Sequence, residues 1–422
     1  MSYRVILEIL NYILSLFFIA SLAVFFSIEV SWEITTAETF DVRHSTYSSF
    51  NAHYLNKTRN LSNNIDDSVY SQVASSGDNV YVVWEQSVRG PNAKNYDIFF
   101  MVSNNGGINF SDPVNLSNNK GFSEHPQISA TEKNVYILWA DNSNGMRQIL
   151  FRKSVDGGEN FDQMIKLSRN ISSSYNAELA AFGSSVIAVW NELDIQKGNV
   201  IMLKESQDRG FSFEETKELG ASDLQTYPKI VAYKDQTYVT WNTNRTNDQT
   251  HQIVLSKVLN DGQDLPTMQK RIAKYLQDGE SHITALDRYV LVFWTDGNEQ
   301  GHKNLYYTRS TNYGDDFGDI VDISQRFDDS SNVETAFVDG NLYVVWQEGI
   351  SRNQEIFIRT SSNGGVTFGQ AINISNNNGT SECPSISVSN NKVHVVWEDD
   401  TLGNHEIYYK SINGNNTVSP VS

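Results

Sequence analysis

Acidic residues recur at two places along this chain, in a pattern that would bring many carboxylates to one surface. Crowded carboxylates can bind a cation or a polyhydroxylated ligand, and close neighbours can raise the pKa of one of them until it serves as a general acid. The default interpretation is that they are solvated groups at strand ends. The first set follows a tryptophan and comprises Glu85, Asp141, Glu192, Asp296, Glu348 and Glu398. The second set precedes a short apolar segment and comprises Asp66, Asp67, Glu124, Glu178, Glu280, Glu334 and Glu382.

Members of the second set are candidate catalytic acids, and the first set together with Tyr227 forms a candidate ligand-binding rim. His125 and His282 lie in the same loops as Tyr227, so the three side chains could supply sugar-stacking or hydrogen-bonding surfaces. No two histidines have metal-ligand spacing on one strand, and the single cysteine, Cys383, excludes an intrachain disulfide and a cysteine-based zinc site. We therefore expect no metal and no cofactor. The catalytic candidates are Asp67, Glu124, Glu178, Glu280 and Glu382.

The elements that must position these acids repeat along the chain. An apolar run rich in β-branched and aromatic residues ends in tryptophan seven times, at intervals of 51 to 55 residues. Such runs, for example residues 80–84, are typical of buried strands. Each repeat also contains a second apolar run, a glycine turn, a short strand such as 113–117 and a strand such as 125–129, which makes four strands. The tryptophans are Trp84, Trp139, Trp190, Trp241, Trp294, Trp346 and Trp397.

A period near 50 residues built from four short antiparallel strands is typical of a β-propeller blade. The tryptophan count therefore predicts an all-β, seven-bladed propeller. Residues 57–62 resemble a fourth strand with no first three before it, whereas the last repeat stops after its third strand, 405–411. We expect residues 57–62 to join the seventh blade, closing the ring and removing an exposed edge. Because the strands alternate in direction, both acidic sets are expected on the face opposite the glycine turns.

The glycine turn has the composition Ser-x-Asp/Asn-x-Gly-x-x-Phe in five repeats. Glycine adopts a positive φ without a Cβ penalty, the Ser and Asp/Asn side chains can satisfy turn amides, and the Phe can pack as an apolar anchor. A calcium loop is the alternative, but one carboxylate, replaced by an amide in three copies, is too few ligands. Degraded versions lie around 256–262 and 411–415. The structural residues are Ser103, Asn105, Gly107, Phe110, Ser154, Asp156, Gly158, Phe161, Ser206, Asp208, Gly210, Phe213, Ser310, Asn312, Gly314, Phe317, Ser361, Asn363, Gly365 and Phe368.

These turns resemble the Asp-boxes of bacterial-neuraminidase (BNR) repeats, and the resemblance covers residues 57–411. It implies a sialidase-like propeller and, as one hypothesis, an exo-acting glycosidase. Sialidases hold a substrate carboxylate with three arginines, the first in an Arg-Ile-Pro motif, and add an aspartate acid/base and a tyrosine activated by glutamate. Here the one Arg-x-Pro, residues 89–91, falls in a connecting loop after Trp84. Blades are entered instead by residues 124–126 (Glu-His-Pro), 226–228 (Thr-Tyr-Pro) and 382–384 (Glu-Cys-Pro). Sialidases also have six repeats, so we expect a non-sialidase member of this superfamily.

Composition and the N-terminus bear on where the protein acts. The chain has 422 residues, with 50 acidic residues against 32 Lys and Arg, a net charge of −18, which argues against a nucleic-acid partner. Residues 12–28 are apolar and uncharged, and Arg4 precedes them, as in a membrane anchor or a signal peptide. We expect one hydrophobic helix within residues 1–31, a linker at 32–55, the propeller at 56–411 and a tail at 412–422.

The expected function is that of an extracytoplasmic binding module. Nine Asn-x-Ser/Thr acceptor sites agree with an exported glycoprotein. The propeller is expected at the cell surface, anchored in the membrane by the N-terminal segment, or secreted if that leader is cleaved. Its partner would be a glycan or an extracellular protein. Two alternatives stay open: an exo-acting glycoside hydrolase or lyase that uses the rim carboxylates, and a structural role in the cell envelope.

Overall fold

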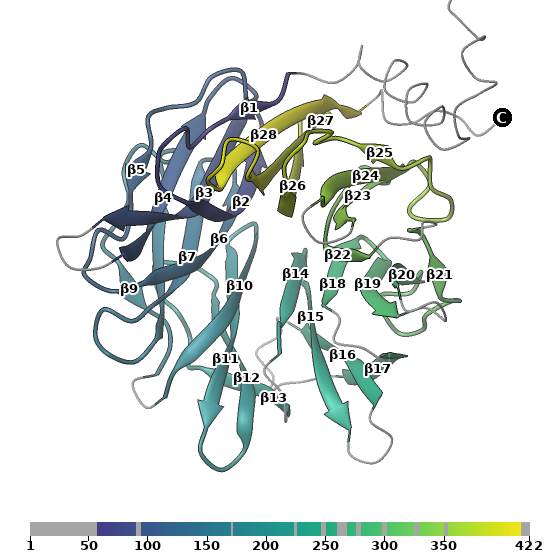
Figure 1. The fold of residues 1–422 in the computed structure, drawn as a ribbon. Helices are drawn as coiled ribbons and strands as arrows, with labels where there is room; N and C mark the ends of the chain where they lie inside the picture. The colour runs from purple at the N-terminus through teal and green to yellow at the C-terminus, as the bar shows by residue number, and fades with distance from the viewer. Residues whose placement is uncertain are drawn as a thin grey trace, which may run out of the picture. The chain divides into compact units, whose positions relative to one another are not determined.

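The described part of the chain is built from seven four-stranded antiparallel sheets, as the sequence predicts (Figure 1). The computed structural model describes residues 57–89, 94–169, 172–222, 226–245, 250–259, 268–275, 280–297, 302–324, 329–349 and 353–414. The innermost strand of each sheet contacts the innermost strands of its two neighbours around a closed ring. The seven sheets are therefore the blades of a β-propeller, and they lie within the compact unit Asn56–Ser422.

The innermost strands surround the central channel, and the second strands pack directly behind them. The innermost strands, from the first blade to the seventh, are β2 (Ser68–Ser76), β6 (Ser123–Thr131), β10 (Ser174–Phe182), β14 (Lys229–Tyr233), β18 (Ser281–Leu286), β22 (Ser330–Val338) and β26 (Ser381–Ser389). The second strands are β3 (Asn79–Arg89), β7 (Asn134–Asp141), β11 (Ser185–Asp194), β15 (Gln236–Arg245), β19 (Tyr289–Gly297), β23 (Asn341–Glu348) and β27 (Lys392–Asp399).

The third and fourth strands complete each blade toward the outside. The third strands are β4 (Lys94–Ser103), β8 (Gln148–Ser154), β12 (Gly198–Ser206), β16 (Thr250–Leu259), β20 (Lys303–Ser310), β24 (Glu355–Ser361) and β28 (Glu406–Asn413). The fourth strands of the first six blades are β5 (Val114–Asn115), β9 (Ile165–Lys166), β13 (Lys217–Ser222), β17 (Met268–Tyr275), β21 (Val321–Asp322) and β25 (Ile372–Asn373). The fourth strand of the seventh blade is β1 (Arg59–Asn60).

The repeated tryptophans all lie on the second strands and are buried between blades. Trp84 and Trp346 are fully buried, and Trp294 is the most exposed of the seven at 3%. Aromatic side chains from the third strand stack on several of them, as Phe99 does on Trp84 with ring centroids 5.9 Å apart. Removing such a side chain from a core costs about 3–5 kcal/mol, so these residues fix the spacing of the blades.

The ring closes as predicted, because the start of the described chain supplies the last strand of the seventh blade. In Figure 1 the purple β1 lies beside the yellow β28. The Leu61 amide donates to the Ile407 carbonyl at 2.7 Å, and the Ile407 amide donates to Ser62 Oγ at 2.9 Å. The same pair of bonds occurs in three other blades. The amides of Leu116, Leu167 and Ile374 donate to the carbonyl groups of Ile98, Ile149 and Ile356, and the amides of these three isoleucines donate to the Oγ atoms of Ser117, Ser168 and Ser375.

The Asp-box turns are held by hydrogen bonds among their own residues. In the second blade, Ser154 Oγ donates to Asp156 Oδ1 at 2.6 Å and accepts from the Gly158 amide at 2.9 Å. The hydrogen bond from Ser154, together with those from Asn160, lowers the pKa of Asp156 to about 2. The Ser–Asp/Asn and Ser–Gly bonds recur in the other four copies. These side chains satisfy turn amides that no strand pairs.

The phenylalanine that ends each Asp-box packs on the blade before its own. Phe161 meets Phe100 edge to face with ring centroids 5.0 Å apart, and Phe110 of the first blade meets Tyr409 of the seventh in the same way, also at 5.0 Å. The turns therefore join neighbouring blades as well as neighbouring strands.

Several expectations fall on parts of the chain that the structure does not describe. The expected N-terminal helix and linker lie outside the described residues, as does the end of the fourth blade's degraded turn. No helix within the described ranges is both long enough and apolar enough to cross a bilayer. Arg89, which was expected in a connecting loop, is instead the last residue of β3. Strand β28 continues to Asn413, two residues beyond the expected boundary of the propeller.

Candidate functional site

Five innermost strands carry the same irregularity where they enter the blade. Each has a β-bulge, shown by a shift in its pairing register with the second strand. At each bulge one non-glycine residue has a positive φ, between 49° and 52°. A bulge redirects a side chain and is common beside functional sites. The five residues are Tyr70, His125, Asn176, Asn332 and Cys383.

These residues belong to a ring around one end of the channel, which we call the mouth ring. Positive φ is strained for a bulky side chain and costs on the order of 1–3 kcal/mol, so it needs support from its surroundings. Tyr227 and Glu280 occupy the corresponding positions just before β14 and β18. The mouth ring, one residue per blade, is therefore Tyr70, His125, Asn176, Tyr227, Glu280, Asn332 and Cys383.

Buried side chains of the preceding blade hold three of the bulges in place, and at one of them Gln347 Oε1 accepts a hydrogen bond from the Cys383 amide at 2.9 Å. Glu398 Oε2 accepts a hydrogen bond from the Tyr70 amide at 3.2 Å, and Glu85 Oε2 accepts one from the His125 amide at 3.1 Å. Burial raises the pKa of Glu85 to about 8, and the charges of Glu124 and Glu398 add to that rise. The carboxylates that directly follow Trp84 and Trp397 therefore support the backbone of the mouth ring.

A second ring lies two positions further along each innermost strand, and we call it the floor ring. Each member pairs with the residue that precedes the blade's tryptophan, as Gln72 does with Val83 and His282 does with Phe293. The floor ring comprises Gln72, Gln127, Glu178, Lys229, His282, Glu334 and Ser385.

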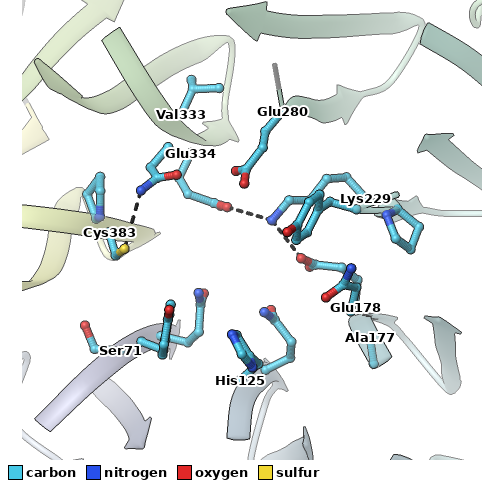
Figure 2. Close-up of a pocket in the computed structure, with 17 residues that line it drawn as sticks. Ser71, His125, Ala177, Glu178, Lys229, Glu280, Val333, Glu334 and Cys383 are labelled. Carbon is cyan, nitrogen blue, oxygen red and sulfur yellow. Dashed lines mark hydrogen bonds and ion pairs between the residues drawn. The ribbon is translucent and has the colours of Figure 1, made fainter. Parts of the chain in front are cut away.

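The two rings enclose a pocket at the mouth of the channel (Figure 2). Its volume is about 330 Å³, within the range of roughly 300–1,000 Å³ that small-molecule sites occupy. All seven members of the mouth ring line it, and so do five members of the floor ring: Gln72, Gln127, Glu178, Lys229 and Glu334. Every blade thus contributes to this one cavity.

A network of charged side chains spans the floor of the pocket. Lys229 Nζ lies 2.7 Å from Glu178 Oε1 and 3.2 Å from Glu334 Oε1, as Figure 2 shows. His282 Nδ1 lies 3.5 Å from the same Glu334 oxygen. The third, fourth, fifth and sixth blades are tied together through these contacts.

The two carboxyl groups that share Lys229 differ in their affinity for a proton. Burial raises the pKa of Glu178, and the shared ammonium group does not offset that rise. Burial also acts against ionisation of Glu334, but His282 and Lys229 outweigh it and lower the pKa of Glu334 to about 2. Although burial by itself lowers the pKa of Lys229, the two carboxylates raise it above its ordinary value. Glu334 is therefore the ionised partner of Lys229, and Glu178 accepts a proton more readily.

Glu280 is the third carboxylate of the pocket. Its charge helps to raise the pKa of Lys229, but it makes no direct contact with the network. Figure 2 shows its carboxylate pointing into the pocket between Glu334 and Lys229. Across the described ranges no hydrogen bond or ion pair joins it to another residue. Three carboxylates thus line the pocket against one lysine, and no arginine is among the lining residues that the structure describes.

Two of the catalytic candidates, Glu178 and Glu280, line the pocket, and the other three lie outside it. Tyr227, His125 and Glu334, which the sequence also singled out, line it as well. Glu124 is ion-paired with Arg147. The Asp67 carboxylate accepts a hydrogen bond from the His405 amide at 3.3 Å. Glu382 pairs with Glu398 in the strand register and does not line the pocket.

The acids two positions after the tryptophans accept hydrogen bonds within the blade or at its edge instead. Glu348 accepts from the indole nitrogen of Trp346 at 2.8 Å, and Glu192 accepts from that of Trp190 at 3.4 Å. Asp141 accepts from Ser123 Oγ at 2.8 Å, and Asp296 accepts from the backbone amide of Gly297 at 2.8 Å.

Sequence reasoning did not single out most of the pocket. Lys229, Tyr70, Gln72, Gln127, Asn176, Asn332 and Cys383 were not among its candidates, and Glu334 was not among the catalytic ones. One signal could have found several of them. Aligning the segments 125–127 (His-Pro-Gln), 227–229 (Tyr-Pro-Lys) and 383–385 (Cys-Pro-Ser) on their shared proline places equivalent mouth and floor residues in register.

Metal binding receives no support from the side-chain arrangement. No group of three or more His, Cys, Asp and Glu side chains in the described ranges is placed to hold a metal ion. The chemistry available in the pocket is hydrogen bonding, aromatic stacking and carboxylate charge.

No protein-family model matches this chain, and no curated protein matches it. Solved structures do match it. The polysaccharide lyase Uly1 superposes with a TM-score of 0.55 at 9% identity, covering 86% of this chain and 100% of that one. The endosialidase of phage phi92 superposes with a TM-score of 0.52 at 10% identity, covering 88% and 70%. A protein of unknown function from Dyadobacter fermentans DSM 18053 superposes with a TM-score of 0.51 at 12% identity, covering 84% and 99%.

These similarities confirm the sialidase-like propeller fold that the Asp-box turns indicated. The chain shares its architecture with glycoside hydrolases and with a polysaccharide lyase. At identities this low the likeness concerns the fold, so any activity has to be argued from the pocket itself.

Proposed function

We propose that this protein is an extracytoplasmic carbohydrate-binding propeller that holds a glycan in the pocket at the mouth of its central channel. The observation that carries the proposal is that one cavity is lined by the mouth-ring side chains of all seven blades. A site assembled from every blade of a closed ring is rigid, which lowers the ordering cost of binding.

The side chains around the mouth suit a sugar. Tyr70 and Tyr227 are 41% and 43% exposed, so their rings are open to a ligand. The ring of His125 lies next to that of Tyr70, with centroids 4.4 Å apart. Aromatic faces pack on the apolar face of a sugar. The amide nitrogens of Asn176 and Asn332 donate to other residues of the protein, and their side-chain carbonyl oxygens can accept hydrogen bonds from sugar hydroxyl groups.

Glycoside hydrolysis is the second candidate, and one specific observation favours it. Because the Glu178 and Glu334 oxygens both contact the Lys229 ammonium group, they lie no more than about 6 Å apart, close to the separations of roughly 5–9 Å that glycosidases use. Their pKa values are also shifted in opposite directions. The ammonium group, however, occupies the space between them in which a glycosidic bond would have to lie. Binding without turnover is therefore the function we propose.

A glycan array with parallel turnover assays on the full chain tests the proposal. We expect binding of at least one glycan without release of product, and at least a tenfold loss of affinity in Tyr227→Ala. Tyr313→Ala is the matched control, because Tyr313 is also 43% exposed but lies in an Asp-box turn at the other end of its blade. Product release that Glu178→Gln abolishes would replace this proposal with hydrolysis. Absence of any glycan binding, or equal losses in both tyrosine variants, would contradict it.

We also propose that the protein acts at the cell surface, held by residues 1–31 or released from them. The charge-free run at 12–28 supports this placement. Protease treatment of intact cells, followed by detection of the propeller, tests it. Digestion of the propeller in intact cells, or its recovery from the medium, is the expected result, and protection of the propeller until the cells are lysed would contradict it.

A further inference from the structure

We propose that the glycan bound in this pocket carries a free, protonated amino group, and that Glu280 is the counter-ion of that group. The ligand would be an amino sugar that is not N-acetylated. This inference rests on the proposed function and narrows the class of sugar that the pocket accepts.

The charges lining the pocket are unbalanced. Glu178, Glu280 and Glu334 face a single cation, Lys229, and that cation already contacts two of them at 2.7 and 3.2 Å. Protonation of Glu178 would reduce the imbalance but would leave two carboxylates, Glu280 and Glu334, to share one ammonium group. A carboxylate enclosed by low-dielectric walls attracts a cation and repels an anion. An anionic sugar such as a sialic or uronic acid would therefore bind poorly.

Glu280 is placed to make this contact. Its carboxylate points into the cavity, and in the described ranges it makes no hydrogen bond or ion pair, although it lies close enough to Lys229 to raise the pKa of that ammonium group (Figure 2). It belongs to the mouth ring, so a ligand can reach it without disturbing the ion pairs of the floor. A charge-assisted hydrogen bond between ammonium and carboxylate is about twice as strong as a neutral one.

A second, independent feature indicates that the pocket is completed by a polar ligand. Ser71 is one of the lining residues, is only 1% exposed, and its hydroxyl makes no hydrogen bond within the described part of the protein. A buried hydroxyl without a partner costs about 1–3 kcal/mol. A sugar hydroxyl in the pocket would satisfy that group.

The surroundings favour an amino sugar over the other common source of an ammonium group, a lysine side chain of a protein. A sugar ring brings hydroxyl groups and an apolar face together with its amine. The pocket offers partners for all three in Asn332, Tyr227 and Glu280. A lysine side chain brings neither hydroxyl groups nor a ring face to meet Asn332 and Tyr227, which opposes its binding.

Calorimetric titration of the full chain with three trimers tests the inference: tri-glucosamine, its fully N-acetylated form and tri-lysine. We expect tri-glucosamine to bind at least tenfold more tightly than either of the others at pH 6. Glu280→Gln should weaken tri-glucosamine binding at least tenfold and leave the affinity for the acetylated trimer unchanged. The control Glu159→Gln, an exposed acid in the Asp-box turn of the second blade, should change neither affinity.

Failure of this inference is distinguishable from failure of the proposed function. Equal affinity for the two sugar trimers would overturn the amino-sugar inference while leaving glycan binding in place. Tri-lysine binding as tightly as tri-glucosamine would overturn it in favour of a protein ligand. A preference for tri-glucosamine that survives Glu280→Gln would remove the role of Glu280. Absence of binding to every glycan would remove both proposals together.

Discussion

Lys229 of the fourth blade lies 3.2 Å from Glu334 of the sixth blade, so one ion pair reaches past the fifth blade across the mouth of the channel. The side chains of both residues are about four-fifths buried, at 16% and 21% exposure. The same ammonium group contacts Glu178 of the third blade. The ion pairs at the floor of the pocket therefore link the third, fourth and sixth blades, in addition to lining the cavity.

Removing the lysine should leave Glu178 without its ion-pair partner and Glu334 with His282 alone. We expect Lys229→Met to lower the free energy of unfolding by about 2–4 kcal/mol at pH 7, because an uncompensated buried charge is costly. Without the lysine, both carboxyl pKa values rise, so protonation removes the uncompensated negative charge as the pH falls. At pH 4.5 the loss in free energy of unfolding should therefore be clearly smaller. Urea unfolding at the two pH values measures this. Lys234→Met, at an exposed ion pair with Asp287, should cost less than about 0.5 kcal/mol, and a loss in Lys229→Met that does not change with pH would contradict the account.

Glu85 should make the protein less stable in alkaline solution. Its pKa in the folded state is about 8, above the ordinary value of 4.5, so its protonated form stabilises the fold fully below about pH 4.5 and that contribution is lost as the pH rises through 8. Glu85→Gln keeps an oxygen for the His125 amide and cannot ionise. We expect the free energy of unfolding of this variant, measured in urea, to exceed that of the wild type by about 2 kcal/mol or more at pH 9 and by much less at pH 5. A benefit of equal size at both pH values would show that Glu85 is not titrating in this range.

Gly158 should not tolerate a side chain, for a reason separable from its backbone angle. Its φ is +86°, and a Cβ there would lie 2.6 Å from the ring of Phe100 in the preceding blade. Gly77 has φ +60° with open space around it, so Gly77→Ala measures the backbone cost alone. We expect the free energy of unfolding, measured by thermal denaturation, to fall by about 1 kcal/mol in Gly77→Ala and by about 2–4 kcal/mol in Gly158→Ala. Equal losses would mean that the turn is not packed against its neighbour.

Closure of the ring should depend on the Leu61 amide. Leu61→Pro removes the donor to the Ile407 carbonyl and should cost about 2–4 kcal/mol, whereas Leu61→Val keeps the amide and should cost about 1 kcal/mol. Limited trypsin digestion provides a second readout. Arg59 donates hydrogen bonds to the carbonyl groups of Gly107 and Ile108, so cleavage after it should be slow in the wild type and fast in Leu61→Pro. Equal cleavage rates in the two proteins would contradict closure by β1.

The architecture could be predicted from the sequence because its signals are repeated and local. The spacing of Trp84 and its six counterparts sets the number of blades, and the strand composition of residues 57–62 indicates where the missing fourth strand comes from. The pattern repeats along the sequence because every blade must bury the same face of its strands.

The pocket could be predicted only in part, because small shifts along a strand decide which side chains reach it. Glu85 directly follows a tryptophan and supports the mouth ring, whereas Asp141 stands one position further on in its blade and accepts a hydrogen bond from Ser123 at the start of β6. Neighbouring residues of a strand point to opposite sides, so grouping these acids together hid their different roles. The bulges at Tyr70 and His125 add a further shift that no spacing in the sequence reveals.

A crystal structure of the full chain with tri-glucosamine tests most directly whether the channel mouth is the binding site. The account predicts one sugar ring inside the pocket, with its amino nitrogen within about 3.2 Å of a Glu280 oxygen and its apolar face against Tyr227. Sugar density on the Asp-box turns or along the outer strands, with the channel mouth holding only water, would contradict it.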